Sequence, residues 1–494
     1  MATAETPSLL DRFLRLFTDV RAGEGVTALL LSSNVFLLLS SYYILKSIRD
    51  GLILAGSGAE VKAYTSALQV VVLAGVVPLY GRLADRLPRR KLINLVTLAF
   101  AASFVGLAGI VVLGFDIGVV FFVWVSVFAV MIMAQFWSFA NDLYTRQDGE
   151  RLFPLVAFGQ SLGAVVGATY AAQLAAPFGI PNLVLAAVVM LVGALAITNY
   201  IDNRERRLKE SHLPPEQTTA VMVATRALKV QKAQRMLRHF TGEPEPEDDE
   251  AAVGAADLRA GTGAKRDDDK EPDPVGSFAL VLGTRYLLMI GFLMLLLNFV
   301  NTTGGYILDR LLVEAAERMT AAGEAGGLTQ GEFLTAYYGS FYQIVNLTGL
   351  IMQLFLVSRV VKYLGVAVGL MILPLISLGA YGLIGFYPVL SYVRWAKTAE
   401  NATDYSLNNT VRNMLFLPTT REQKYKAKQA IDSFFWRTGD MMSALLVLVG
   451  TTMLALSTSG FALVNIGAVV VWLVLAYRIG MEYKRLIATG ETPR

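Results

Sequence analysis

The 494-residue sequence contains no cysteine, which excludes disulfide bonds, thiol catalysis and cysteine-based metal sites. It has only two histidines, His212 and His239, and both lie in a polar stretch, so a histidine proton relay inside a membrane is excluded as well. No GxxxxGK[ST] phosphate loop is present, so we do not expect ATP hydrolysis. The first 25 residues carry four acids and no small-residue cleavage site, which argues against a signal or transit peptide.

Charge is also scarce: charged residues make up 17% of the chain, against about 25% in soluble domains. Hydrophobic residues reach 54%, and they recur in runs far longer than the roughly ten-residue strands of a membrane β-barrel. Because a helix needs about 20 apolar residues to cross a bilayer, we predict an all-α polytopic membrane protein with twelve transmembrane helices. The predicted spans are 26–48, 63–84, 92–114, 118–143, 153–176 and 181–201, then 282–306, 336–358, 363–386, 388–410, 430–454 and 460–480.

The connections between the spans alternate in charge. Four of them, 82–91, 200–209, 421–428 and 477–485, are basic, whereas the alternate ones carry almost no basic residue and 307–335 is rich in acids. The positive-inside rule then places both termini in the cytoplasm and 307–335 outside. The predicted parts are a cytoplasmic segment 1–25, a six-helix bundle 26–201, a cytoplasmic linker 202–277, a second six-helix bundle 278–480 and a cytoplasmic tail 481–494.

The two sets of six spans resemble weak repeats. Residues 50–54 (DGLIL) parallel residues 309–313 (DRLLV), and a basic hairpin follows both the second and the eighth span. This pattern indicates two pseudo-symmetric bundles in a major-facilitator-like arrangement. In that arrangement the first, fourth, seventh and tenth spans line a central cavity.

Two of these spans carry charges on one helix face. Lys46, Arg49 and Asp50 are three or four residues apart at the end of the first span. In the tenth span, charges follow at intervals of three, three and four residues, at Arg394, Lys397, Glu400 and Asp404. Charges within spans usually face a cavity or a partner, and the alternative at a helix end is snorkelling to the interface. Cations on two facing helices favour an anion site, with Glu400 and Asp50 as counter-charges or gating partners.

The fourth and seventh spans add polar side chains beside aromatic ones. Asn141 follows Trp137 and Phe139, and Asn301 lies in an apolar helix. Such amides suit a nucleobase, and they equally suit ordinary hydrogen bonds between helices. In the hairpin 81–92, Asp85, Arg86 and Arg89 predict a cytoplasmic charge latch, and we include Asp142, Arg146, Lys424 and Lys428 among the gating residues.

Two further segments have structural interpretations. Gly159, Gly163 and Gly167 form a double GxxxG pattern, which predicts a close helix-packing face. Residues 225–240 are basic and predict a surface amphipathic helix within an otherwise acidic linker, which either joins the halves or regulates them.

Several motifs resemble those of the ATP/ADP translocase family, the NTP/NDP exchange transporters of plastids and intracellular bacteria, which are divergent relatives of the major facilitators. These are ILKSIRDGLIL (44–54), FWSFAN (136–141), LFPLVAFG (152–159), YSLNNTVRNMLFLP (405–418) and KYKAKQAID (424–432). The resemblance implies antiport of ATP for ADP and phosphate by alternating access, with transport cations at Arg49 and Arg412. It also implies cytoplasmic cations at Lys424, Lys426 and Lys428.

The sequence departs from this family at two points. Asn301 stands where the seventh span is expected to carry an acid, and the fourth span contains no glutamate. Another nucleotide, another phosphorylated anion or a different coupling ion therefore remains open. The alternatives from other classes are a proton-coupled exporter of an unrelated solute, with Asp50, Asp142 or Glu400 as proton carrier, and a membrane scaffold that does not transport.

The expected partners are a nucleotide or other phosphorylated anion and the lipid bilayer, with no nucleic acid. We expect a monomer in a bacterial inner membrane that uses no cofactor and no metal and is not an enzyme.

Overall fold

The computed structural model describes residue 21 and residues 24–144, 146–211, 274–324, 326–420 and 423–493. It forms two compact units, one of residues 1–198 and 274–494 and one of residues 199–273, of which 199–211 are described. The predicted amphipathic helix 225–240, both histidines and most of the predicted segments 1–25 and 202–277 lie outside the described residues. The described ends of that linker, 202–211 and 274–277, are helical.

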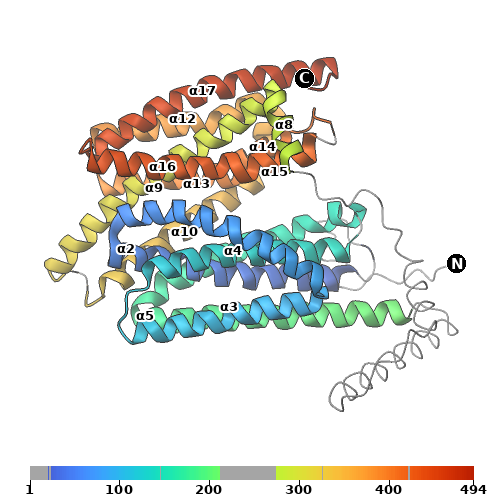
Figure 1. The fold of residues 1–494 in the computed structure, drawn as a ribbon, viewed down its shortest axis with the longest axis horizontal. Helices are drawn as coiled ribbons and strands as arrows, with labels where there is room; N and C mark the ends of the chain where they lie inside the picture. The colour runs from blue at the N-terminus through green and yellow to red at the C-terminus, as the bar shows by residue number, and fades with distance from the viewer. Residues whose placement is uncertain are drawn as a thin grey trace, which may run out of the picture. The chain divides into compact units, whose positions relative to one another are not determined.

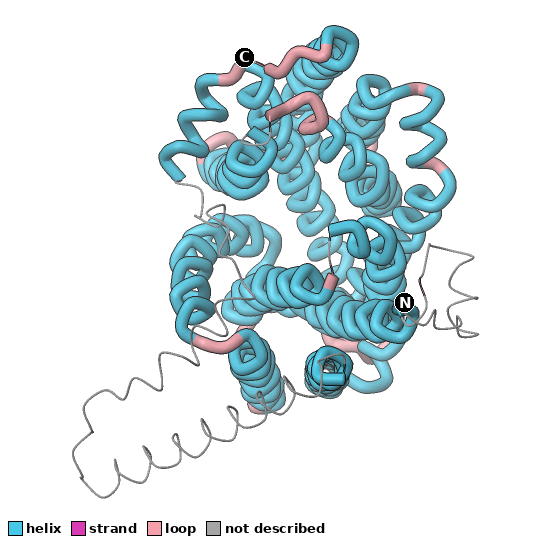
Figure 2. The backbone as a smooth tube through the Cα atoms, turned by 90° about the vertical axis from the view of Figure 1, so that its right-hand side faces the viewer, coloured by secondary structure: helices cyan, strands magenta, loops and turns pink. Residues whose placement is uncertain are grey.

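Every described element is a helix (Figure 1). The first half contains α2 (Glu24–Arg86), α3 (Arg89–Val112), α4 (Gly118–Leu143) and α5 (Arg146–Ser211). The second half contains α8 (Pro274–Gly283), α9 (Arg285–Ala321), α10 (Gln330–Phe355), α11 (Val357–Tyr363), α12 (Gly365–Phe386), α13 (Leu390–Thr403), α14 (Asn409–Met414), α15 (Lys428–Ala430), α16 (Trp436–Thr452) and α17 (Thr458–Thr489), with π-helical turns η1 (Asp404–Asn408), η2 (Gln423–Ala427) and η3 (Ile431–Phe435). Figure 2, which looks along the helices, shows the two halves as separate groups.

The two longest helices each contain two of the predicted spans. α2 is kinked at Gly58 (φ 82°) and α5 at Gly179 (φ 73°), and only glycine adopts this backbone region readily. Each kink replaces the loop that we expected between two spans. α9 continues beyond the predicted span end at residue 306 to Ala321, so the first part of the segment 307–335, which we predicted to lie outside, is helical.

Seven of the described helices are long and apolar enough to cross a membrane, or eight if the bent pair α10 and α11 forms one span. Two of these seven, α2 and α5, hold two predicted spans each. α16 has only 17 residues, and α13 carries the charged stripe. The count of twelve and the direction of the termini remain predictions.

The double GxxxG pattern forms the predicted packing face. A Cβ atom added at Gly159, Gly163 or Gly167 would lie 2.5, 2.3 and 2.3 Å from the carbonyl oxygens of Ser32, Phe36 and Ser40. All three distances are shorter than van der Waals contact, so only glycine lets the backbones of α5 and α2 approach this closely.

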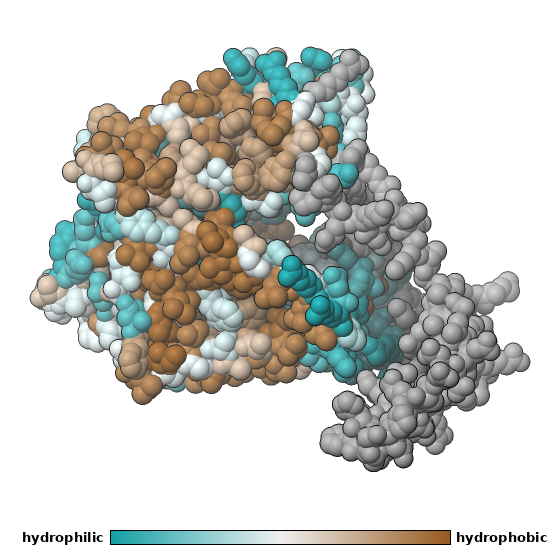
Figure 3. Space-filling view, in the orientation of Figure 1, coloured by the Kyte–Doolittle hydropathy of each residue, from teal (hydrophilic) through white to brown (hydrophobic). Residues whose placement is uncertain are grey.

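The two halves touch closely at one end, which we call the closed end. We define it by residues 51–63 and 171–180 of the first half and by residues 305–324 and 326–340 of the second. A Cβ atom on Gly51 would lie 2.8 Å from the Thr335 backbone nitrogen, and one on Gly339 would lie 2.3 Å from that of Ala172. On the side that bears the C-terminal end of α17, Figure 3 shows a hollow between the halves. The closed end therefore seals the space between the two halves on one side.

Candidate functional site: a charged cavity between the two halves

A cavity of about 230 Å³ lies between the halves next to the closed end. Residues of α2, α4, α9, α10, α13 and η1 line it, so both halves contribute. Its charged residues are Lys46, Arg49, Asp50, Lys62, Asp309 and Lys397. Its aromatic residues are Phe122, Tyr306, Tyr338, Phe341, Tyr342 and Tyr405, and its amides are Asn301 and Asn401. The helices predicted to line a central cavity do so, and α10 joins them.

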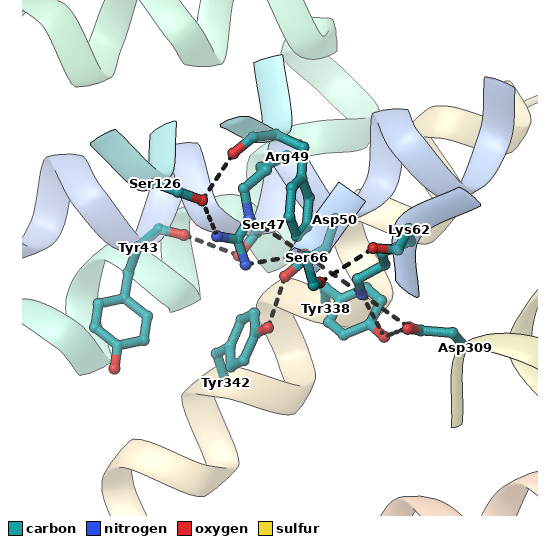
Figure 4. Close-up of polar contacts among 11 residues, drawn as sticks. Tyr43, Ser47, Arg49, Asp50, Lys62, Ser66, Ser126, Asp309, Tyr338 and Tyr342 are labelled. Carbon is teal, nitrogen blue, oxygen red and sulfur yellow. Dashed lines mark hydrogen bonds and ion pairs between the residues drawn. The ribbon is translucent and has the colours of Figure 1, made fainter. Parts of the chain in front are cut away.

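Asp50 is fully buried, and its carboxylate is contacted by the polar groups of three other side chains. Arg49 Nη2 lies 3.1 Å from Asp50 Oδ1, Lys62 Nζ lies 3.4 Å from the same oxygen, and the Tyr342 hydroxyl donates to Oδ2 at 2.6 Å. Figure 4 shows these side chains converging from α2 and α10. A buried carboxylate requires this degree of pairing, because an isolated charge is costly away from water. Asp50 is thus the counter-charge of Arg49 and Lys62 in this structure, and its bond to Tyr342 joins the halves.

Lys62 connects the two halves a second time. Its ammonium lies 2.9 Å from Asp309 Oδ1 on α9, and the Tyr338 hydroxyl donates a hydrogen bond to the same oxygen. A neighbouring bond runs from the Tyr306 hydroxyl to Glu60 Oε1 at 2.8 Å. The polar contacts of Asp50, Glu60 and Lys62 therefore bond the first half to α9 and α10 at the closed end.

Arg49 also contacts α4. Its Nη1 donates to Ser126 Oγ on α4 at 3.1 Å, and its guanidinium carbon lies 4.3 Å above the Phe122 ring. These contacts fix the plane of the guanidinium within the cavity. Arg differs from Lys in this respect, because a fixed planar fork can present two parallel donors to one anion.

Lys46 has no carboxylate partner among the described residues, although it lines the same cavity. Its ammonium lies 4.0 Å from the centre of the Tyr342 ring and 5.1 Å from that of Tyr43. Cation–π contacts stabilise the ammonium but leave its donors available. Lys46 is the cavity cation best placed to accept an anionic ligand.

On the opposite wall, Lys397 is only 2% exposed. Its Nζ lies 2.8 Å from Glu400 Oε2 and 2.7 Å from Asn301 Oδ1. Glu400 lies behind Lys397, where Tyr381 and Ser377 donate further hydrogen bonds to it. The predicted amide Asn301 thus orients a cavity cation through its side chain.

Four predicted binding residues do not line the cavity: Glu400, which lies behind Lys397, and Arg394, Arg412 and Asn141. Arg394 donates to Ser340 at 2.8 Å and covers the Tyr337 ring, Arg412 lies 5.1 Å from the Trp436 ring, and Asn141 is exposed at the end of α4. Asn141 stands too near the end of its helix to face the cavity, which begins near Phe122 on the same helix. The structure gathers the remaining predicted binding residues in or directly behind the cavity.

The predicted gating residues lie away from the cavity. Arg89 Nη1 forms an ion pair of 2.8 Å with Asp142, so the start of α3 is bonded to the end of α4. Asp85 and Arg86 are exposed, and Lys428 donates to Asn413 Oδ1 at 2.7 Å. The side chains of Arg146 and Lys424 lie outside the described residues.

Sequence reasoning missed the residues that bond the halves together. Lys62 was not singled out, and Asp309 was noted only within the acidic external segment 307–335 and as the parallel of Asp50. The parallel between residues 50–54 and 309–313 was the available signal, because it places Asp309 opposite Asp50. Tyr338 and Tyr342 look like ordinary aromatic residues of an apolar helix until the fold places their hydroxyls beside carboxylates.

Two helical halves that meet around a charged cavity define the architecture of a membrane transporter. The profile described as Major Facilitator Superfamily matches residues 25–398, and the chain belongs to this superfamily. It is therefore a multi-pass membrane protein. The profile described as TLC ATP/ADP transporter matches residues 382–483. No curated protein matches the chain.

Solved transporter structures share the fold. A POT family transporter in complex with 5-aminolevulinic acid has a TM-score of 0.57 at 14% identity, covering 93% of this chain and 96% of that chain. The peptide transporter POT in complex with sulfate has a TM-score of 0.57 at 14% identity, with coverage of 97% and 99%. The nucleoside transporter NupG has a TM-score of 0.56 at 11% identity, with coverage of 93% and 99%. At these identities the likeness shows the fold alone.

Proposed function

We propose that the chain is a secondary transporter that carries a phosphorylated anion, of the nucleotide class, by alternating access. One observation carries the proposal: four cations and only two carboxylates line a single cavity between the halves, and Lys46 is paired with neither carboxylate. Such a cavity favours a multiply charged anion over a cationic or neutral solute. It contains no arrangement that we would assign to catalysis, so we propose transport without a chemical step.

In this proposal Arg49 and Lys46 bind the phosphate from the first half, and Lys397 binds it from the second. The guanidinium supplies a planar fork and the ammonium groups supply point charges. The cavity of about 230 Å³ is below the roughly 300–1,000 Å³ typical of ligand pockets. We therefore assign the phosphate end of the substrate to the cavity and the remainder to the adjoining hollow, with aromatic faces such as those of Phe122 and Tyr405 available for a base.

The TLC ATP/ADP transporter match supports the nucleotide class, because residues 382–483 contain Lys397, Glu400 and Arg412. We propose exchange of nucleotides of the ATP/ADP type, by a monomer in the bacterial inner membrane with both termini in the cytoplasm. With that orientation the closed end faces outward and the hollow faces the cytoplasm. The Arg89–Asp142 pair and the exposed Asp85 and Arg86 are then placed to latch the opposite conformation.

The proposal is tested by uptake of labelled ATP or ADP into proteoliposomes. We expect Lys46→Met and Arg49→Gln to weaken uptake about tenfold or more, since a hydrogen bond to a charged group contributes about 1.5–3 kcal/mol. The matched control is Lys362→Met, which removes an exposed lysine remote from the cavity and should leave uptake unchanged. Normal uptake by both cavity variants would reject the assignment.

Counterflow separates exchange from proton coupling. Nucleotide loaded inside the vesicles should accelerate uptake from outside, and a pH gradient without internal nucleotide should not. Uptake driven by the pH gradient alone would favour the proton-coupled alternative, and no uptake by the unaltered protein under either condition would favour a scaffold.

A further inference from the structure

A second and larger cavity lies away from the central one, between the start of α9 and the end of α17. Its volume is about 760 Å³, and Arg285 of α9 and Arg478 of α17 both line it. Arg485, on the same wall, lies 3.6 Å from Glu482 and 3.3 Å from Glu491, so its charge is compensated. Neither Arg285 nor Arg478 forms an ion pair with any described carboxylate. Two helices thus present unpaired guanidinium groups to one hollow.

The position of this cavity matches the depth of lipid headgroups. Arg285 is the first residue of the apolar helix α9, and Arg478 follows the apolar run of α17 directly. Basic residues at the ends of membrane helices lie at the interface, and basic pockets between such helices bind anionic headgroups. Figure 3 shows the change from hydrophobic surface to hydrophilic residues near the end of α17.

An apolar strip leads away from the arginines along α17. Val470, Val474 and Tyr477 are spaced by four and three residues, so they share one helix face, and they are 48%, 53% and 59% exposed. A soluble anion would gain no binding free energy from this apolar strip, whereas an acyl chain would bury its surface. We infer that Arg285 and Arg478 hold the phosphate of an anionic phospholipid whose acyl chain lies along Val470, Val474 and Tyr477.

The test is lipid retention by the purified full chain, measured by native mass spectrometry during titration with phosphatidylglycerol or phosphatidylcholine. The variant is Arg285→Gln with Arg478→Gln, and the matched control is Arg318→Gln with Arg359→Gln, which removes two arginines elsewhere. At about 1 kcal/mol per basic residue near the lipid surface, the first pair should weaken phosphatidylglycerol binding about thirtyfold and the control pair should not. Phosphatidylcholine binding should be the same in all three proteins.

Unchanged phosphatidylglycerol binding by the first pair would overturn the inference, as would an equal loss of both lipids. A third arm adds inorganic phosphate: if millimolar phosphate displaces phosphatidylglycerol, the cavity takes a soluble anion and the lipid assignment is wrong. The melting temperature in neutral detergent checks that the variants fold. Because lipid retention needs no transport, this result is independent of the nucleotide assay.

Discussion

Lys62 lies between two carboxylates from different halves, Asp50 at 3.4 Å and Asp309 at 2.9 Å. Its side chain is 13% exposed, so water compensates little of the charge. The three groups behave as one buried unit, because removing the cation leaves two carboxylates facing each other away from solvent.

We expect Lys62→Met to destabilise the protein by about 3–5 kcal/mol, the cost of breaking a buried ion pair from one side. The double variant Lys62→Met with Asp309→Asn should recover part of the loss, because Tyr338 can still donate to the amide oxygen at position 309. Thermal unfolding in detergent of the unaltered protein, the two single variants and the double variant gives the coupling energy between the two residues. Additive effects of the two substitutions would show that the pair does not act as a unit.

The sequence predicts the charges of the cavity better than their partners. Lys46, Arg49, Asp50, Lys397 and Glu400 stand out because each is a charge at helical spacing in an apolar context. Their partners Ser126, Tyr342 and Tyr381 are common in membrane helices, and only tertiary packing distinguishes them from neighbours. Single charges near span ends, such as Lys62 and Asp309, follow the pattern of snorkelling residues, so the sequence gives no reason to place them in the cavity.

At the scale of elements, glycine determines how closely the helices approach. The GxxxG pattern in α5 is readable because its period matches one helix face, and its partner, the backbone of α2 at residues 32–40, has no comparable signature. The same limit applies to Gly58 and Gly179. Their positive φ values turn an expected loop into a kink, and composition alone does not distinguish these outcomes.

We expect Gly163→Ala to lower the melting temperature clearly and to reduce the yield of folded protein. A Cβ atom at this position would lie 2.3 Å from the Phe36 carbonyl oxygen and 2.9 Å from its Cα, and backbone atoms cannot move aside as a flexible side chain can. The matched control is Gly106→Ala in α3, where no heavy atom lies within 4 Å of the added Cβ. There the melting temperature should hold or rise slightly, because alanine is the better helix former. Equal stability of the two variants would show that the α5–α2 contact is loose.

At the scale of the whole molecule, the architecture was predictable because hydropathy and basic hairpins repeat with the two halves. Which end is closed was not predictable. It depends on contacts between residues far apart in sequence, such as Gly51 with Thr335 and Gly339 with Ala172, that carry no local pattern. The conformation is a property of the packed halves rather than of any one segment.

The absence of cysteine allows the closed end to be locked without background thiols. A Cβ atom on Gly331 would lie 3.8 Å from the Ala55 Cβ, which equals the mean Cβ–Cβ distance of about 3.8 Å in disulfides. We expect Ala55→Cys with Gly331→Cys to form a disulfide under mild oxidation and to lose uptake of labelled nucleotide, and dithiothreitol should restore it. Each single cysteine variant serves as the control. If the oxidised double variant transports normally, the closed end does not have to open.

The charges around the central cavity also determine how the empty protein differs from the loaded one. Lys46, Arg49, Lys62 and Lys397 give four positive charges, and Asp50, Asp309 and the adjoining Glu400 give three negative ones, so one ammonium is left over. Reorientation without cargo would carry that surplus through a low-dielectric path, whereas a bound anion compensates it. Exchange of two anions of equal charge would then not depend on the membrane potential. Swapping anions that differ by one charge would be electrogenic, with a driving force of about 2.3 kcal/mol per 100 mV.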